Sequence, residues 1–239
     1  MTGKSEIYFL HGFWGTPDDF QETQKYLSDF HIHNLSLKQF SPKEGLRDFA
    51  DRLNEKAKVT KSKKYLVGYS MGGRLALHAL MTQPEVWAGA VLVSTHPGLR
   101  EPADKAQRTH WQNQWAEKFL NLPQEQLEQE WQSQEVFTAT TQVKKTTLDV
   151  EDRRYLAAAL TYWGSDRHLF TWSELKKSNC PLLWCAGEED HKYQQLLKVM
   201  RDAGLPGEMG TAPKAGHRII FDQPEWLAQK ITTFIRGKK

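Results

Sequence analysis

A serine flanked by glycines follows directly on a short apolar run, and this junction restricts the folds open to the chain. Residues 65–67 are Tyr-Leu-Val, residues 68–72 are Gly-Tyr-Ser-Met-Gly, and apolar residues then recur at helical spacing over 74–81. A serine between glycines at a strand-to-helix turn is typical of a nucleophile elbow, because the tight turn lifts the hydroxyl clear of the backbone. The start of the helix also favours negative charge there. The pentapeptide alone fits an ordinary turn equally well, but its flanking elements favour the elbow.

The rest of the chain alternates short apolar strands with helices. Strands are predicted at 7–10, 32–37, 65–67, 91–93 and 182–186, and helices at 18–27, 46–57, 74–81 and 224–235. This alternation predicts an α/β fold with a mostly parallel, doubly wound sheet. No buried strand is evident between residues 98 and 170, a region rich in Gln, Glu, Lys, Arg and Trp. We therefore expect a core made of residues 1–97 and 171–239, with residues 98–170 inserted as a helical cap.

Length and composition indicate a globular protein of one domain with an insertion. Of the 239 residues, 39% are hydrophobic and 26% charged, which excludes collagen-like and strongly disordered proteins. The net charge of +3 is spread along the chain, which predicts no nucleic-acid partner but is compatible with a small anionic ligand. No apolar run approaches the ~20 residues that cross a bilayer, and the polar start carries no signal segment. We expect no membrane insertion and a cytoplasmic location, and the oligomeric state stays open.

The cysteines and the absence of ligand motifs in the sequence predict neither a disulfide nor a cofactor. Cys180 and Cys185 are five residues apart on a predicted strand. A strand rises about 3.3 Å per residue, which places their Cα atoms beyond the ~7 Å that a disulfide can span. The sequence has no zinc-like His/Cys spacing and no Gly-x-Gly-x-x-Gly. We therefore predict no metal and no organic cofactor.

A serine nucleophile requires a base, and the later part of the chain offers one in the expected order. In hydrolases with such an elbow, the acid and then the histidine follow the serine. Asp190 follows the predicted strand at 182–186, and His217 lies in a loop near the C-terminus. Glu188 and Glu189 are rivals for the acid, but Gly-Glu-x-Asp is the usual form of this loop. We predict that His217 takes the proton of Ser70 and that Asp190 holds the imidazole tautomer.

The same pattern predicts an oxyanion hole built from backbone N–H groups. One donor is expected from Met71, the residue after the nucleophile. The other is expected from the loop after the first strand, His-Gly-Phe-Trp-Gly at 11–15, where Phe13 is the best candidate. His11 itself is expected to be structural rather than catalytic.

Taken together, these segments resemble a known enzyme family. The quoted motifs are His-Gly-Phe at 11–13, Gly-Tyr-Ser-Met-Gly-Gly-Arg at 68–74, His-Pro-Gly-Leu at 96–99, Gly-Glu-Glu-Asp at 187–190 and Ala-Gly-His at 215–217. They are similar to the 2-succinyl-6-hydroxy-2,4-cyclohexadiene-1-carboxylate synthases of menaquinone biosynthesis, which have the α/β-hydrolase fold. The resemblance covers most of the chain, although the cap matches only loosely.

The resemblance implies a lyase rather than a hydrolase. Members of this family eliminate pyruvate from 2-succinyl-5-enolpyruvyl-6-hydroxy-3-cyclohexene-1-carboxylate. Carried over, the triad serine would act as the base, and the N–H groups of Phe13 and Met71 would stabilise an enolate-like oxygen. The substrate carries several carboxylates, which guanidinium groups bind bidentately. The substrate-binding residues implied are Tyr69, Arg74, Arg108, Trp131 and Lys192.

Several alternatives stay open at this point. The same triad could serve a serine carboxylesterase or thioesterase, and a non-catalytic binding module on the same fold is a third reading. The family has an arginine late in the cap that is missing at 155–162, where Arg153, Arg154 or Arg167 could substitute. Trp111 and Trp115 share one helix face, which we expect to pack on the sheet domain rather than to form a mobile lid.

Overall fold

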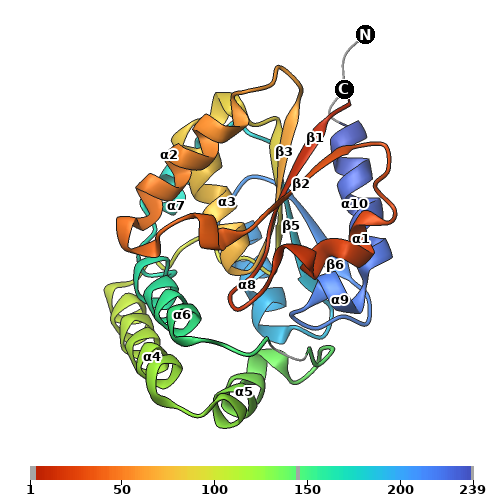
Figure 1. The fold of residues 1–239 in the computed structure, drawn as a ribbon. Helices are drawn as coiled ribbons and strands as arrows, with labels where there is room; N and C mark the ends of the chain where they lie inside the picture. The colour runs from red at the N-terminus through yellow and green to blue at the C-terminus, as the bar shows by residue number, and fades with distance from the viewer. Residues whose placement is uncertain (1–3, 144–145, 238–239) are drawn as a thin grey trace.

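Six parallel strands form the sheet at the centre of the computed structural model, which describes residues 4–143 and 146–237 (Figure 1). The strands are β1 (Glu6–Leu10), β2 (His31–Leu35), β3 (Lys64–Tyr69), β4 (Gly89–Val93), β5 (Leu182–Gly187) and β6 (Glu208–Ala212). They lie in the order β2-β1-β3-β4-β5-β6, and every neighbouring pair is parallel. The predicted doubly wound sheet is therefore confirmed. All strands end at the same edge, which brings distant loops together.

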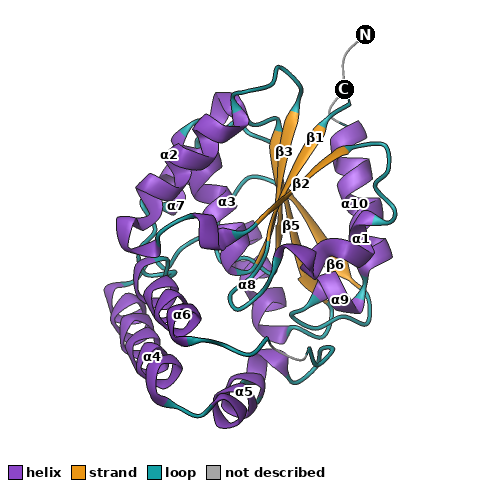
Figure 2. Cartoon of the chain, in the orientation of Figure 1, coloured by secondary structure: helices purple, strands orange, loops and turns teal. Residues whose placement is uncertain are grey.

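Helices cover both faces of this sheet (Figure 2). One face carries α2 (Gly45–Ala57), α3 (Met71–Thr82), α7 (Trp172–Lys176) and α8 (His191–Asp202), and the other carries α1 (Gln21–Gln24), α9 (Ile219–Asp222) and α10 (Pro224–Arg236). Side chains alternate along each strand, so Tyr8 and Leu10 join the first apolar cluster while Ile7 and Phe9 join the second. This alternation explains why the central strands read as continuous apolar runs.

Three further helices lie beyond the carboxyl ends of the strands. They are α4 (Pro102–Asn121), α5 (Gln124–Gln132) and α6 (Val150–Tyr162), which come between β4 and β5 in the sequence and lie at one end of the sheet in Figure 1. They share an aromatic cluster that includes Trp115, Phe119 and Trp131 and also takes in Trp14 from the loop after β1. Apolar burial thus holds this α4–α6 layer against the sheet.

Two predicted elements have different bounds in the structure. The helix expected at 18–27 is a 3₁₀ turn, Pro17–Phe20, followed by the single turn of α1. The strand expected at 32–37 ends at Leu35, because Leu37 enters a 3₁₀ turn and its N–H donates to His11 Nε2 at 3.2 Å. His11 Nδ1 in turn donates to the Gly12 carbonyl at 2.8 Å, so this ring joins two loops.

The structure also contains elements that the sequence did not single out. Strand β6 lies at the sheet edge with Glu208 and Thr211 exposed, which leaves little apolar pattern to detect.

Cys180 lies before β5, Cys185 lies within it, and both thiols are free. Among the described residues, no helix has the length and apolar character needed to span a membrane.

Candidate active site

Ser70 lies at the junction of β3 and α3 in a backbone conformation that few residues other than glycine adopt. Its φ of 52° and ψ of −110° fall outside the ordinary regions, a strain that occurs mainly at functional sites. The Ser70 N–H donates to the Val93 carbonyl at 2.8 Å, which fixes the turn to β4. A Cβ at Gly72 would overlap the carbonyl oxygens of Leu10 and His11, so only glycine lets α3 approach β1 this closely. The half-buried Ser70 side chain faces a cavity.

The fold brings the three predicted triad residues together from distant parts of the sequence. His217 Nδ1 lies 2.8 Å from Asp190 Oδ2, and His217 Nε2 lies 3.3 Å from Ser70 Oγ. A carboxylate accepts, so Nδ1 carries the proton and Nε2 is free to accept one from the serine. Asp190 also caps α8, accepting from the Tyr193 N–H at 3.2 Å. Asp190 and His217 are 5% and 4% exposed, so water competes little for their contact.

The rival acids lie elsewhere on the same loop. Glu188 and Glu189 are both exposed. The Glu188 carboxylate accepts from the Lys214 N–H at 2.9 Å. Of the three carboxylates considered from the sequence, Asp190 is the one in contact with His217.

The loop that carries His217 is held on two sides. Ser94 Oγ donates to the His217 carbonyl at 2.8 Å from the sheet side. From the other side, the buried Arg218 donates to the Thr141 carbonyl at 2.8 Å in the connection between α5 and α6. Asp222 accepts from the Gly216 N–H at 3.0 Å and from Thr140 Oγ1 at 2.5 Å. The position of the imidazole is thus tied both to β4 and to the α4–α6 layer.

A cavity of about 900 Å³ opens between the sheet edge and the α4–α6 layer. Ser70 and His217 lie on its wall, as do Phe13 and Met71, whose backbone N–H groups are the predicted oxyanion donors. Met71 is the first residue of α3, so its N–H has no partner within the helix. Other side chains on the wall are Arg74, His96, Arg108, Trp111, Gln112, Trp131, Phe137, Lys192 and Tyr193.

Three cationic side chains line this cavity. Arg74 donates to the Trp163 carbonyl, and burial followed by the charge of Arg108 lowers its pKa to about 10. The guanidinium of Arg108 lies 4.0 Å above the Trp111 ring, and burial lowers its pKa. Burial and then Arg108 also lower the pKa of Lys192. Carboxylates also lie on the wall, but among the described residues none of these three cations forms an ion pair with one, so all three are available to an anionic ligand.

The same three cations act on His96, which also lies on the cavity wall. Burial lowers its pKa to about 3, and the charges of Arg74, Lys192 and Arg108 add to this effect, so the ring is neutral at physiological pH. Its Nδ1 accepts from the Gly98 N–H at 3.0 Å, which leaves the proton on Nε2.

The other predicted substrate-binding residues occupy less direct positions. Tyr69 is not on the cavity wall: its ring packs 5.6 Å from that of His217. Trp131 is 5% exposed, packs 4.8 Å from the Phe13 ring and belongs mainly to the aromatic cluster. Trp115 is buried in that cluster, whereas Trp111 is half-buried and lines the cavity, so the two share a face with different surroundings.

None of the three candidates for the missing cap arginine lines the cavity. Arg153 donates to the Phe119 and Leu122 carbonyls at the end of α4. Arg154 pairs with an exposed glutamate one turn away, and Arg167 lies beside Asp166.

Gln112 and Tyr193 are among the polar residues on the cavity wall that sequence reasoning did not assign. Gln112 follows Arg108 by one helical turn and is 1% exposed. Tyr193 lies three residues after Asp190, in the first turn of α8. Residues at this spacing lie on the same side of a helix, so the predicted acid at the helix start could have indicated that Tyr193 faces the site. Among the described residues, no group of three or more His, Cys, Asp or Glu side chains is arranged to hold a metal ion.

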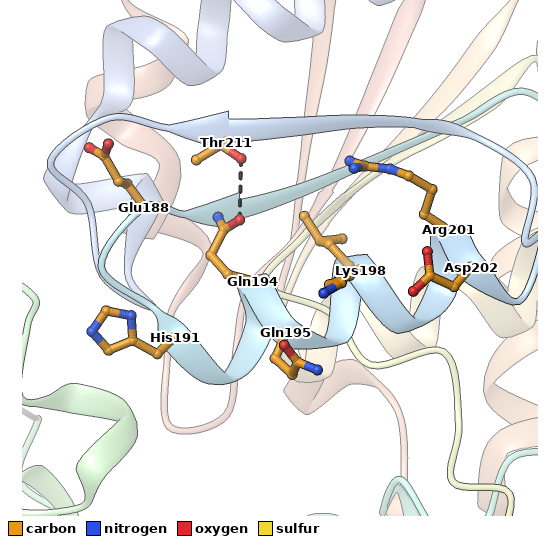
Figure 3. A pocket seen from close by; sticks show the side chains of 9 residues that line it. Glu188, His191, Gln194, Gln195, Lys198, Arg201, Asp202 and Thr211 are labelled. Carbon is orange, nitrogen blue, oxygen red and sulfur yellow. Dashed lines mark hydrogen bonds between the residues drawn. The ribbon is translucent and has the colours of Figure 1, made fainter.

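A second hollow lies on the outside of α8, where that helix runs beside β6 (Figure 3). Gln194 and Thr211 point toward each other across it, with Thr211 Oγ1 3.4 Å from Gln194 Oε1. Glu188, the rival acid, lies on its wall, but none of the predicted triad, oxyanion-hole or substrate-binding residues does. The cavity that holds Ser70 is therefore the candidate active site.

Comparisons with known proteins agree with this architecture. Residues 7–230 match the alpha/beta hydrolase family. A 2-succinyl-6-hydroxy-2,4-cyclohexadiene-1-carboxylate synthase from Serratia proteamaculans is 33% identical, covering 72% of this chain and 67% of the relative. One from Pectobacterium atrosepticum is 26% identical, covering 95% and 92%. The structure of MenH from S. aureus superposes with a TM-score of 0.83 at 21% identity, covering 100% of this chain and 96% of that one. This chain belongs to the alpha/beta hydrolase family and, within it, to the family of 2-succinyl-6-hydroxy-2,4-cyclohexadiene-1-carboxylate synthases.

Proposed function

We propose that this protein eliminates pyruvate from 2-succinyl-5-enolpyruvyl-6-hydroxy-3-cyclohexene-1-carboxylate and forms 2-succinyl-6-hydroxy-2,4-cyclohexadiene-1-carboxylate. The named relatives support this product. We assign Ser70, His217 and Asp190 as the catalytic triad. Phe13 and Met71 supply the oxyanion hole, and Arg74, Arg108 and Lys192 bind the substrate carboxylates.

One observation carries the substrate assignment: the guanidinium groups of Arg74 and Arg108 share a cavity and have no carboxylate partner among the described residues. A buried charge without a partner costs free energy, and the lowered pKa values of both groups reflect that cost. A bound carboxylate removes the cost through two parallel hydrogen bonds per guanidinium. An anionic, multi-carboxylate substrate suits such a cavity better than a neutral ester does.

The atoms of the proposed reaction balance without a cofactor. The difference between a 3-cyclohexene and a 2,4-cyclohexadiene requires loss of the C2 proton, which is acidic because it adjoins the succinyl ketone. Ser70 Oγ takes this proton while passing its own to His217 Nε2, 3.3 Å away. The ring double bond then shifts as the C5–O bond breaks. Enolpyruvate leaves, takes up a proton and becomes pyruvate.

The oxyanion hole serves the enolate formed in the first step. The N–H groups of Phe13 and Met71 donate to the ketone oxygen as it gains negative charge. Asp190 keeps His217 in the tautomer that accepts from Ser70 and stabilises the imidazolium that follows. Trp131 contributes to the aromatic wall, and Tyr69 supports the histidine from behind.

We further propose that residues 98–170 act as a cap over this site and that the protein works in the cytoplasm. The cap supplies Arg108 and closes the side of the cavity opposite the sheet. Water excluded by such a cap cannot compete with the guanidinium groups for the carboxylates. The cytoplasmic assignment is supported by the free thiols of Cys180 and Cys185.

The decisive experiment measures pyruvate release from the enolpyruvyl substrate by purified protein. We expect Ser70→Ala to lower kcat by about 10²–10⁴-fold, the usual contribution of a positioned base. Ser133→Ala, an exposed serine outside the cavity, is the matched control and should keep full activity. Absence of pyruvate release together with rapid cleavage of short acyl esters would refute the proposal.

A serine carboxylesterase or thioesterase is the second candidate, because the Ser70–His217–Asp190 geometry also suits attack on a carbonyl. A hydrolase would form an acyl-enzyme and show a burst of the leaving group, whereas the lyase would not. A fluorophosphonate labels an activated serine in both cases, so labelling alone does not distinguish them.

A further inference from the structure

Tyr193 connects the triad to the cationic part of the cavity. It lies in the first turn of α8, and its backbone N–H donates to Asp190 Oδ1 at 3.2 Å. Its ring lies 4.8 Å from the His217 ring, and its side chain is on the cavity wall. Backbone and ring are therefore fixed by the two residues that control the proton on Ser70.

The Tyr193 hydroxyl lies within the field of the two arginines. Burial and the charge of Asp190 raise the pKa of Tyr193 to about 12, while the charges of Arg108 and Arg74 oppose this rise. Among the electrostatic effects of other residues on the pKa of Arg108, that of Tyr193 is the largest. The phenol is thus protonated at physiological pH, and Tyr193 lines the same cavity as Arg74 and Arg108, where its hydroxyl can donate a hydrogen bond.

This donor is unused within the protein itself. Across residues 4–143 and 146–237, no hydrogen bond joins the Tyr193 hydroxyl to another group. Packing against His217 requires only the ring, which phenylalanine would supply equally well. The hydroxyl therefore points to an interaction with something that enters the cavity.

We propose that the Tyr193 hydroxyl donates a hydrogen bond to the substrate carboxylate that Arg74 and Arg108 hold. A neutral donor adds a third contact to the anion without adding a third buried charge. Because the Tyr193 ring is fixed against His217, this contact also sets the distance between the bound carboxylate and Ser70. Tyr193 is thus a specificity-determining residue that selects substrates with an anionic group at this distance from the reacting proton.

This inference rests on the proposed function, and Tyr193→Phe tests it with little disturbance of packing. A hydrogen bond to a charged group that is present throughout the reaction stabilises substrate and transition state alike, so its loss raises KM. We expect KM for pyruvate release to rise about tenfold or more, the usual effect of losing such a bond. Tyr155→Phe is the matched control: the Tyr155 hydroxyl is buried, has no hydrogen-bond partner among the described residues and is not on the cavity wall. Its KM should not change.

A second readout separates this inference from the proposed reaction. 4-Oxo-4-phenylbutanoate combines a ketone, a ring and a carboxylate, and it should protect Ser70 from a fluorophosphonate. Half-protection is measured relative to each variant's own unprotected labelling rate, so that differences in serine reactivity cancel. We expect Tyr193→Phe to need about ten times more of the acid. The neutral methyl ester should protect wild type and Tyr193→Phe equally weakly.

The outcomes are distinct. If wild type releases no pyruvate but Tyr193→Phe still weakens protection by the acid, the hydroxyl binds a carboxylate and the proposed reaction is wrong. If wild type releases pyruvate and Tyr193→Phe changes neither KM nor protection, the reaction stands and the role of Tyr193 is overturned. Equal weakening by Tyr155→Phe would also overturn it, because the effect would then be general to buried hydroxyl groups.

Discussion

The link between the α4–α6 layer and the histidine loop allows a quantitative test. Asp222 accepts three hydrogen bonds: from the Gly216 N–H at 3.0 Å, from Thr140 Oγ1 at 2.5 Å and from the Thr141 N–H at 2.8 Å. After Tyr69, Asp222 also has the largest electrostatic effect on the pKa of the buried Arg218, and it raises that pKa by stabilising the charged guanidinium. Asp222→Ala removes all of these interactions at once.

The expected loss follows from which groups are left without partners. Thr141 is exposed, so water can replace Asp222 at its N–H, and this contact contributes little. Gly216 is buried, and stranding its N–H costs about 1–3 kcal/mol. With the weaker support of Arg218, we expect a total loss of about 3 kcal/mol in the free energy of unfolding. For a chain of this length that corresponds to roughly 6–12 °C in Tm.

Urea denaturation and steady-state kinetics on the same variant test this reasoning. The urea midpoint should fall without a change in the m-value. The kcat/KM should also fall, by about 10²-fold, because displacement of His217 by about 1 Å weakens its contact with Ser70. Thr140→Ser keeps the hydroxyl and is the matched control. A loss of less than about 1 kcal/mol in Asp222→Ala, or an unchanged kcat/KM, would refute the view that this contact positions the imidazole.

Two further predictions concern the sheet. Burial alone would raise the pKa of Glu6, but hydrogen bonds from Thr60, His33 and other neighbours lower it from 4.5 to about 2. The ionised Glu6 therefore stabilises the fold fully above pH 4.5, and this contribution is lost as the pH falls toward 2. This amounts to at most about 3 kcal/mol, and acid titration of unfolding should show a smaller decline in Glu6→Gln. Gly72→Ala should cost about 3 kcal/mol and abolish Ser70 labelling, because the new Cβ overlaps backbone atoms of β1. Gly210→Ala, with its nearest neighbour at 3.4 Å, should be neutral or stabilise slightly, and thermal melts would contradict the argument if the two variants behaved alike.

The sheet could be predicted from the sequence because its central strands are buried on both faces. Burial on both sides requires continuous apolar runs, and β1, β3, β4 and β5 all have them. The edge strand β6 has one buried residue in five, so its sequence shows almost no apolar pattern from which a strand could be predicted. The length of helix α1 was overestimated, because apolar residues at helical spacing do not reveal that the segment begins as a 3₁₀ turn at Pro17.

The candidate site was predictable to the extent that its residues lie in local motifs. Ser70 and Asp190 each follow a strand that the sequence reveals, so both were expected at one edge of the parallel sheet. His217 was expected from the order serine, acid, histidine, because strand β6 before it was not predicted. Gln112 and Tyr193 could not be assigned in this way, because their place on the cavity wall depends on how α4 and α8 pack. The position of Tyr69 behind His217 likewise follows from side-chain direction at the end of β3, which a motif does not specify.

The same triad can attack a carbonyl or remove a proton, so what surrounds it determines the reaction. In an ester hydrolase the carbonyl carbon must lie next to Ser70 Oγ with its oxygen in the oxyanion hole. Here Arg74 and Arg108 place positive charge on the cavity wall and form no ion pair with a carboxylate of the described residues. When the cations hold the carboxylates of a substrate, the distance from the cations to Ser70 Oγ determines which substrate atom reaches that oxygen. For the enolpyruvyl substrate we expect that atom to be the C2 proton, with the ketone oxygen directed at Phe13 and Met71. We therefore expect Arg74 and Arg108, more than the proposed triad, to determine whether this protein acts as a lyase or a hydrolase.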